Sequence, residues 1–141
     1  MGNNVLTLRK RIIILRVCIG LVYLWFGALK FIHGVSPAEE LAKETINLLT
    51  FGLIPPEISL LLLALWETAI GISLIIGFFT RQIFWFVIVH MVCTFTPLVL
   101  FPDTSFTQAP IALTLVGQYI IKNIVIVSAL LVVRAQDENQ G

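Results

Sequence analysis

Four long runs of hydrophobic residues divide the chain. They cover residues 12–31, 58–79, 83–100 and 113–133, so each holds about 18 to 22 residues. An α-helix rises about 1.5 Å per residue, and a run of this length therefore matches the roughly 30 Å of hydrocarbon in a bilayer. The pattern predicts an all-α membrane protein, a bundle of four transmembrane helices in one integral membrane domain that covers residues 1–141.

The connection between the first two runs has a helical pattern of its own. Ser36 and Glu39 have the spacing of a capping box, and Pro37 between them would occupy the first helical position. Apolar and charged residues then alternate with helical periodicity, and Gly52 is a typical stop. We expect a short amphipathic helix, about residues 37–50, lying flat at the outer membrane interface. A plain linker is the alternative.

The third run contains a proline close to its end. Pro97 lacks the backbone N–H that a continuing helix requires. We therefore expect a kink or a tilt of the third helix there.

The composition supports a membrane location. Hydrophobic residues make up 58% of the chain and charged residues only 12%, whereas a soluble domain is about one quarter charged. So few charges cannot cover a water-exposed surface, but a lipid-facing surface needs almost none. The net charge of +1 indicates no nucleic-acid partner.

The distribution of lysine and arginine predicts the orientation. Basic residues occur before the first run, between the second and third, and after the fourth: Arg9, Lys10, Arg11, Arg81 and Arg134. The other two connections are mainly acidic, with Glu39, Glu40, Glu44, Glu57 and Asp103 against a single Lys43. Because basic segments stay in the cytoplasm, both termini should be cytoplasmic.

Ionisable residues inside the predicted helices are the candidates for function. Counted from the cytoplasmic ends at ~1.5 Å per residue, Glu67 is ~18 Å deep, His90 ~12 Å and Lys122 ~16 Å. We predict a buried Glu67–Lys122 ion pair with His90 nearby, accompanied on the fourth helix by Gln118 and Asn123. Such a pair either fixes the helix register or serves the function, and the sequence leaves both open.

The first helix adds a stripe of polar and small residues. Arg16, Gly20, Tyr23, Gly27 and Lys30 are spaced four, three, four and three residues apart, which places them on one face. Glycines on such a face allow a neighbouring helix to approach closely. We therefore expect Arg16, Tyr23 and Lys30 to face the bundle interior, with Lys30 under the amphipathic helix.

Other kinds of site are not indicated. His33 and His90 differ in depth and make no metal or haem site. Cys18 and Cys93 also differ in depth, so we expect no disulfide between them. No catalytic motif and no cofactor site is evident, although a quinone is compatible with the polar interior.

Three motifs resemble the DoxX family of small four-helix bacterial membrane proteins. Residues 16–20 and 25–31 resemble the opening helix of that family, residues 67–71 with Gly77 and Arg81 its second helix, and residues 117–123 its last helix. The similarity covers roughly residues 12–133. It implies a multi-pass protein of the bacterial inner (plasma) membrane.

The resemblance also suggests functions. The family takes its name from a subunit of a thiosulfate:quinone oxidoreductase, and other relatives are associated with oxidative or thiol stress or with membrane-protein assembly. The first hypothesis is a redox- or stress-associated membrane subunit, not an enzyme as an isolated chain, whose polar midplane site binds a quinone or a small sulfur compound. The alternatives are a non-enzymatic scaffold or assembly factor with structural buried charges, and a proton-coupled carrier of small molecules. The partners expected are membrane lipid, a membrane or redox protein, and further copies of the chain.

Overall fold

The computed structural model describes residues 2–36, 38–78 and 81–138. Within these ranges four helices are long and apolar enough to cross a membrane, and their spans are Leu6–Leu29, Pro56–Ile76, Arg81–Leu100 and Leu115–Gln136. The predicted fold class, a bundle of four membrane-spanning helices, is confirmed.

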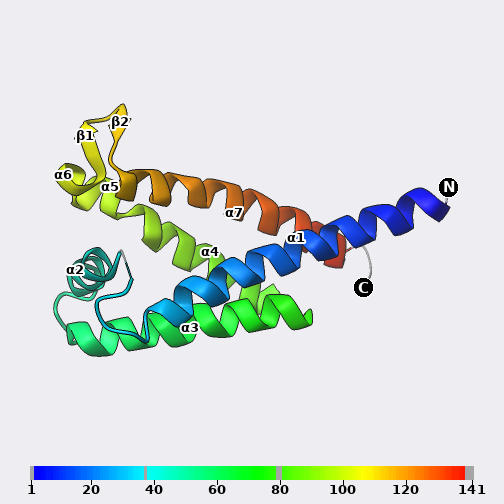
Figure 1. Cartoon of the computed structure of the whole chain (residues 1–141), viewed down its shortest axis with the longest axis horizontal. Helices are drawn as coiled ribbons and strands as arrows, with labels where there is room; N and C mark the ends of the chain where they lie inside the picture. Colours follow the sequence, from blue (N-terminus) through cyan, green and yellow to red (C-terminus); the bar gives the residue numbers. More distant parts are fainter. Residues whose placement is uncertain (1, 37, 79–80, 139–141) are drawn as a thin grey trace.

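The elements follow one another along the chain without any long irregular stretch. They are α1 (Gly2–Leu29), α2 (Glu39–Leu49), α3 (Pro56–Ile76), α4 (Arg81–Phe95), α5 (Pro97–Leu100), α6 (Pro102–Ser105), β1 (Phe106–Gln108), β2 (Ala112–Leu113) and α7 (Leu115–Glu138). Figure 1 shows both termini at one end of the molecule, here called the termini end. The helix α2 and the β1–β2 hairpin lie at the opposite end, here called the α2 end.

Most predicted boundaries differ from those of the structure, and the largest differences are at the start of α1, the end of α3 and the end of α7. The helix α1 begins ten residues earlier than predicted, at Gly2, because its lysine and arginine residues are good helix formers and do not interrupt it. The helix α3 ends at Ile76 because Gly77 takes a left-handed conformation (φ 86°). Residue 79, the predicted end of that span, lies outside the described residues. The helix α7 continues to Glu138, beyond its apolar run.

The glycines of α1 allow close contact with a neighbouring helix, as predicted, and this helix is α3. A β-carbon on Gly71 would lie 2.5 Å from the backbone nitrogen of Leu24, and one on Gly20 would lie 2.9 Å from the backbone oxygen of Gly71. One on Gly27 would lie 2.8 Å from the backbone nitrogen of Thr68. Only glycine fits at these positions, and α1 and α3 therefore form a tightly packed pair.

The third span is interrupted where Pro97 predicts it. The helix α4 ends at Phe95, and α5 begins at Pro97. The chain then forms α6 and the antiparallel β1–β2 hairpin, which the hydrophobic pattern does not reveal. This segment packs on the start of α7, where a β-carbon on Gly117 would collide with the carbonyl oxygen of Ser105.

The short helix α2 exists, but its predicted cap does not. The helix begins at Glu39, and no side chain caps the preceding Ala38. Pro37 lies outside the described residues. The carboxylate of Glu39 is engaged elsewhere, as described below, and so cannot complete a capping box. In Figure 1 α2 is seen nearly end-on while the four long helices run lengthwise, so α2 lies across the end of the bundle.

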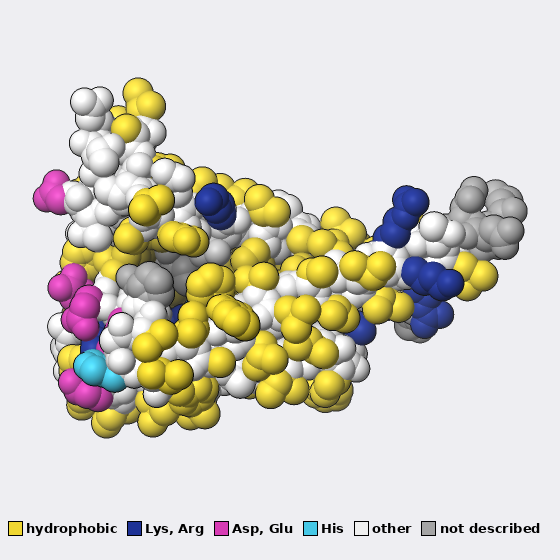
Figure 2. All heavy atoms as spheres, viewed as in Figure 1, with side chains coloured by type: hydrophobic (Ala, Val, Ile, Leu, Met, Phe, Trp, Pro, Cys, Tyr) yellow, Lys and Arg dark blue, Asp and Glu magenta, His cyan; other side chains and the backbone are white. Residues whose placement is uncertain are grey.

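The apolar core occupies the part of the bundle nearer the termini. All four long helices contribute to it: Ile19, Tyr23, Ile70, Leu74, Phe84, Val87, Met91, Leu130 and Val133. Outside the core, Figure 2 shows hydrophobic side chains over most of the middle of the visible face, acidic side chains gathered at the α2 end and basic side chains near the start of α1. An apolar belt between two charged ends is the surface that a bilayer requires.

Candidate functional site

The centre of the candidate site is an ion pair between α1 and α3. Lys30 directly follows α1, and its Nζ lies 2.5 Å from Oε2 of Glu67. The side chains of Lys30 and Glu67 are only 8% and 11% exposed. Lys30 also donates to the carbonyl oxygen of Phe26 at 3.3 Å. The close approach of Gly27 to Glu67 brings the end of α1 to the level of the carboxylate.

Two further polar side chains face this pair from α1 and α4. Nε2 of His90 lies 3.7 Å from Oε1 of Glu67, which is too long for a hydrogen bond. The ring of Tyr23 packs on the ring of His90 with 6.1 Å between centroids. Within the described part of the chain, the hydroxyl of Tyr23, both ring nitrogens of His90 and the hydroxyl of Thr68 are buried without hydrogen-bond partners. Buried polar groups are almost always satisfied, so this cluster has unused capacity to bind a polar ligand or water.

A cavity lies beside Lys30 at the α2 end. Its volume is about 170 Å³, and it is lined by Lys30, Phe31, His33, Lys43, Glu57, Leu60 and Leu61. Glu57 belongs to the first turn of α3, whereas Lys30 reaches the carboxylate in the middle of that helix. On the opposite side of the cluster the apolar core fills the bundle. Lys30 therefore links the cavity at the α2 end with the ion pair, because it lines the one and belongs to the other.

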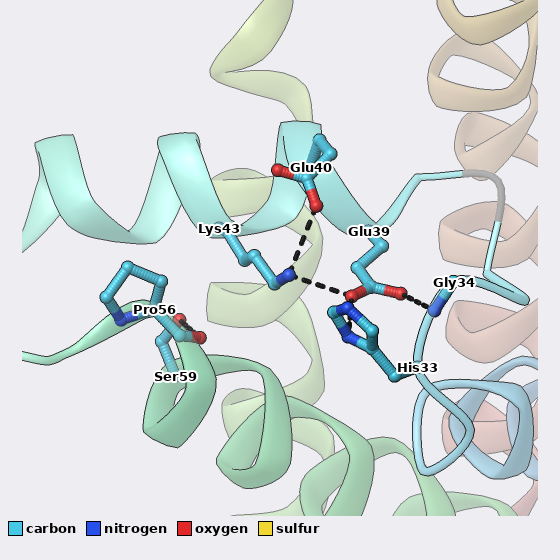
Figure 3. A network of polar contacts seen from close by, with 7 residues as sticks. All are labelled: His33, Gly34, Glu39, Glu40, Lys43, Pro56 and Ser59. Atoms are coloured by element: carbon cyan, nitrogen blue, oxygen red, sulfur yellow. Dashed lines mark hydrogen bonds and ion pairs between the residues drawn. The ribbon is translucent and has the colours of Figure 1, made fainter.

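Glu39 lies at the rim of this cavity and joins the α1–α2 connection to α2, as Figure 3 shows. Its carboxylate accepts hydrogen bonds from the backbone N–H of Gly34 at 2.7 Å and from Nζ of Lys43 at 2.8 Å. Nδ1 of His33 lies 2.7 Å from it, and Lys43 also contacts Glu40 at 3.1 Å. The hydrogen bond from Lys43, aided by that from Gly34, lowers the pKa of Glu39, and the bonds to Glu39 and Glu40 raise the pKa of Lys43.

The prediction that Lys122 pairs with Glu67 is wrong. Lys122 is exposed on α7, and its Nζ lies 5.5 Å from the ring centroid of Tyr119 on the same helix. Gln118 is exposed as well. The depth of a residue in a span fixes its layer but not the direction in which it points, so Glu67 and Lys122 can share a layer without meeting.

Two more predicted site residues lie away from the cluster. Asn123 faces α4, where its Nδ2 lies 3.5 Å from the hydroxyl of Thr94. Arg16 lies at the far end of α3, where a β-carbon on Gly77 would come within 2.9 Å of its guanidinium. A cation beside a helix C-terminus is favourable, which gives Arg16 a structural role there. Of the eight predicted site residues, the structure thus brings together Tyr23, Lys30, Glu67 and His90.

Sequence reasoning missed two residues of this region. Glu39 was expected on the polar face of α2, but it is only 4% exposed. Its spacing of four residues from Lys43 could have indicated that the two side chains form an ion pair. Thr68 carries no such signal, because its burial results from the approach of Gly27. Both cysteines are free thiols, Cys18 exposed on α1 and Cys93 half-buried on α4.

Four apolar spans around a buried ion pair define a multi-pass helical membrane protein. The sequence model of one family, DoxX, matches residues 12–103, which is well over half of the chain. The protein belongs to the DoxX family. The match ends before α7, so the likeness of residues 117–123 to the last helix of the family stays a prediction. Neither the curated proteins nor the solved structures compared with the chain gave a match.

Proposed function

We propose that this protein is a redox-associated membrane subunit whose buried polar cluster binds the head group of a quinone. The observation that carries the proposal is the pair of unused donors beside the ion pair, the hydroxyl of Tyr23 and the imidazole of His90. A quinone head group presents two carbonyl oxygens, which accept hydrogen bonds from such donors. Its ring and tail suit the apolar surroundings of the cluster.

The charges of the cluster favour a neutral ligand. Lys30 is already neutralised by Glu67, so an anionic sulfur compound would have to displace a carboxylate in direct contact with the ammonium group. A neutral quinone leaves the ion pair intact. Among the two ligand classes expected from the sequence, the quinone therefore agrees better with this arrangement.

The cluster is also suited to transfer protons. Reduction of a quinone to a quinol takes up two electrons and two protons. Glu67 and His90 face each other across 3.7 Å and would relay the protons from the cavity at the α2 end, while a redox partner protein would supply the electrons. In this proposal the chain is a subunit of a quinone-linked oxidoreductase.

A structural role is the second candidate function. The direct contact between Lys30 and Glu67, together with the glycine packing of α1 on α3, would by itself fix the register of the two helices. A scaffold or assembly factor would need nothing more. The unpartnered Tyr23 and His90 argue for the quinone site, since a purely structural interior would satisfy its polar groups.

The proposed location is the inner membrane of a bacterium with both termini in the cytoplasm. The basic residues Arg9, Lys10 and Arg11 belong to the termini end, and the acidic residues of α2 to the other. Segments rich in lysine and arginine are retained in the cytoplasm. This orientation would open the cavity to the outer side of the membrane.

Binding of a short-chain ubiquinone to the full chain in lipid nanodiscs tests the quinone site. Tyr23→Phe removes one hydrogen bond to the ligand and should raise the Kd about three- to tenfold. Tyr119→Phe is the matched control, because Tyr119 is exposed on α7, and it should leave the Kd unchanged.

Comparison of the two tyrosine variants shows whether the quinone binds at the buried cluster. Equal effects of Tyr23→Phe and Tyr119→Phe would mean that the quinone binds only to the outer surface or to the lipid. Absence of saturable binding by the native chain would leave the structural role as the better account.

A further inference from the structure

The outward face of α7 carries polar groups where lipid contact is expected. Gln118, Tyr119 and Lys122 are all exposed, and they occupy neighbouring turns on one side of the helix. At the same level, the opposite side of α7 packs on the bundle through Gly117 and Ile120.

Lys122 lies too deep to reach water easily. It is seven residues from the start of the span Leu115–Gln136, which corresponds to ~10 Å of helix. A lysine side chain extends roughly 6 Å, so its ammonium group stops short of the headgroups. No carboxylate in the described ranges forms an ion pair with Lys122, whose amino group only rests against the ring of Tyr119. Ionisable groups at this depth almost always face protein or a water-filled cavity rather than lipid.

We infer that the Gln118–Tyr119–Lys122 face of α7 docks a membrane-spanning helix of another protein that carries an aspartate or glutamate at the depth of Lys122. A carboxylate there neutralises the ammonium group inside the bilayer, and Gln118, one turn away, adds an interhelical hydrogen bond. Tyr119 supplies an aromatic surface beside the charge. This surface lies on a different helix from the proposed quinone site, and it stands whether or not a quinone binds.

Charge excludes a second copy of the chain as the occupant. Two copies related by an axis normal to the membrane would place Lys122 against Lys122, and like charges repel. Among the residues that the structure describes, Glu67 is the one carboxylate in the middle of a span, and it is buried and paired with Lys30. A second copy thus has no carboxylate to offer at this depth.

The test uses a designed membrane-spanning peptide of leucine and alanine with one glutamate at the matching depth, and its glutamine counterpart. Energy transfer from the labelled full chain in phosphatidylcholine vesicles measures association. The glutamate peptide should bind the native chain about tenfold more tightly than the glutamine peptide. Lys122→Met should abolish this preference, and Lys122→Arg should keep it.

Three results would overturn the inference. The native chain could bind both peptides equally, or the preference could persist in Lys122→Met, and in either case Lys122 would not recognise a carboxylate. Energy transfer between two labelled copies that is lost in Lys122→Met would instead make the face a contact between copies. Circular dichroism of each variant in the same vesicles establishes that the helical fold is retained.

Discussion

The ion pair between Lys30 and Glu67 allows a quantitative test of what holds α1 to α3. Glu67→Gln leaves a buried ammonium group without its counter-charge, and Lys30→Met leaves a buried carboxylate. The two atoms are 2.5 Å apart and both side chains are about nine-tenths buried, so solvent screens the pair little. Breaking one side of such a pair costs about 3–5 kcal/mol in soluble proteins. In a membrane the loss should be smaller, because the remaining group can change its protonation state.

The double variant Glu67→Gln/Lys30→Met removes both charges. Its free energy of unfolding should therefore recover well beyond the sum of the two single losses, with a coupling of at least about 1 kcal/mol. The assay is reversible unfolding in mixed micelles as the fraction of a denaturing detergent increases. Lys122→Met is the matched control, and it should change the unfolding free energy by less than about 0.5 kcal/mol.

Strictly additive losses would refute the reasoning, since the two side chains would then not interact in the membrane. Quinone binding by the double variant separates the two candidate functions. If stability returns and binding does not, the pair contributes to the site; if both return, the pair is structural.

Three further predictions follow from the packing and the charges. Gly71→Ala should lower the unfolding free energy by about 1–3 kcal/mol in the same detergent assay, because its β-carbon would press on the backbone of Leu24; an unchanged value would mean that α1 and α3 can move apart freely. The pKa of Glu39 is lowered in the folded protein, so its stabilisation is present above the unfolded pKa and is lost as the pH falls through the folded pKa. Amide exchange in α2 should thus accelerate on acidification, and Glu39→Gln should exchange rapidly at every pH; identical profiles would contradict this role. Reporter fusions should place both termini in the cytoplasm, and a periplasmic signal from either would overturn the topology.

The spans could be predicted because bilayer thickness sets the length of an apolar run, whatever the run packs against. The close approach of another helix to α1 could be predicted as well, since Gly20 and Gly27 lie on one helical face, but not that this helix is α3. The partner of Glu67 could not. Helix rise gave Glu67 and Lys122 similar depths, but the rotation of α7 about its axis depends on packing that one sequence does not reveal. Lys30 was expected under α2, yet its long side chain reaches the middle of α3.

The start of α2 shows a second limit of sequence reasoning. The spacing of Ser36 and Glu39 fits a capping box, but the same carboxylate also satisfies the backbone of Gly34 and the ammonium group of Lys43. Several local interactions compete for this one side chain, and here those with Gly34 and Lys43, five and four residues away, prevail over the capping box. The β1–β2 hairpin has too few residues for any periodicity to reveal it.

If protons reach the ion pair from the cavity at the α2 end, as proposed, their delivery would depend on the membrane voltage. Glu67 stands near the middle of the 21-residue helix α3, so an ion that enters from the α2 end crosses about half of the electric field before it arrives. One charge moved across a full 100 mV corresponds to about 2.3 kcal/mol, so half the path corresponds to about 1.2 kcal/mol. That energy changes the occupancy by a proton about sevenfold. Binding of a neutral quinone would be independent of the membrane potential. Delivery of each proton to it would depend on that potential.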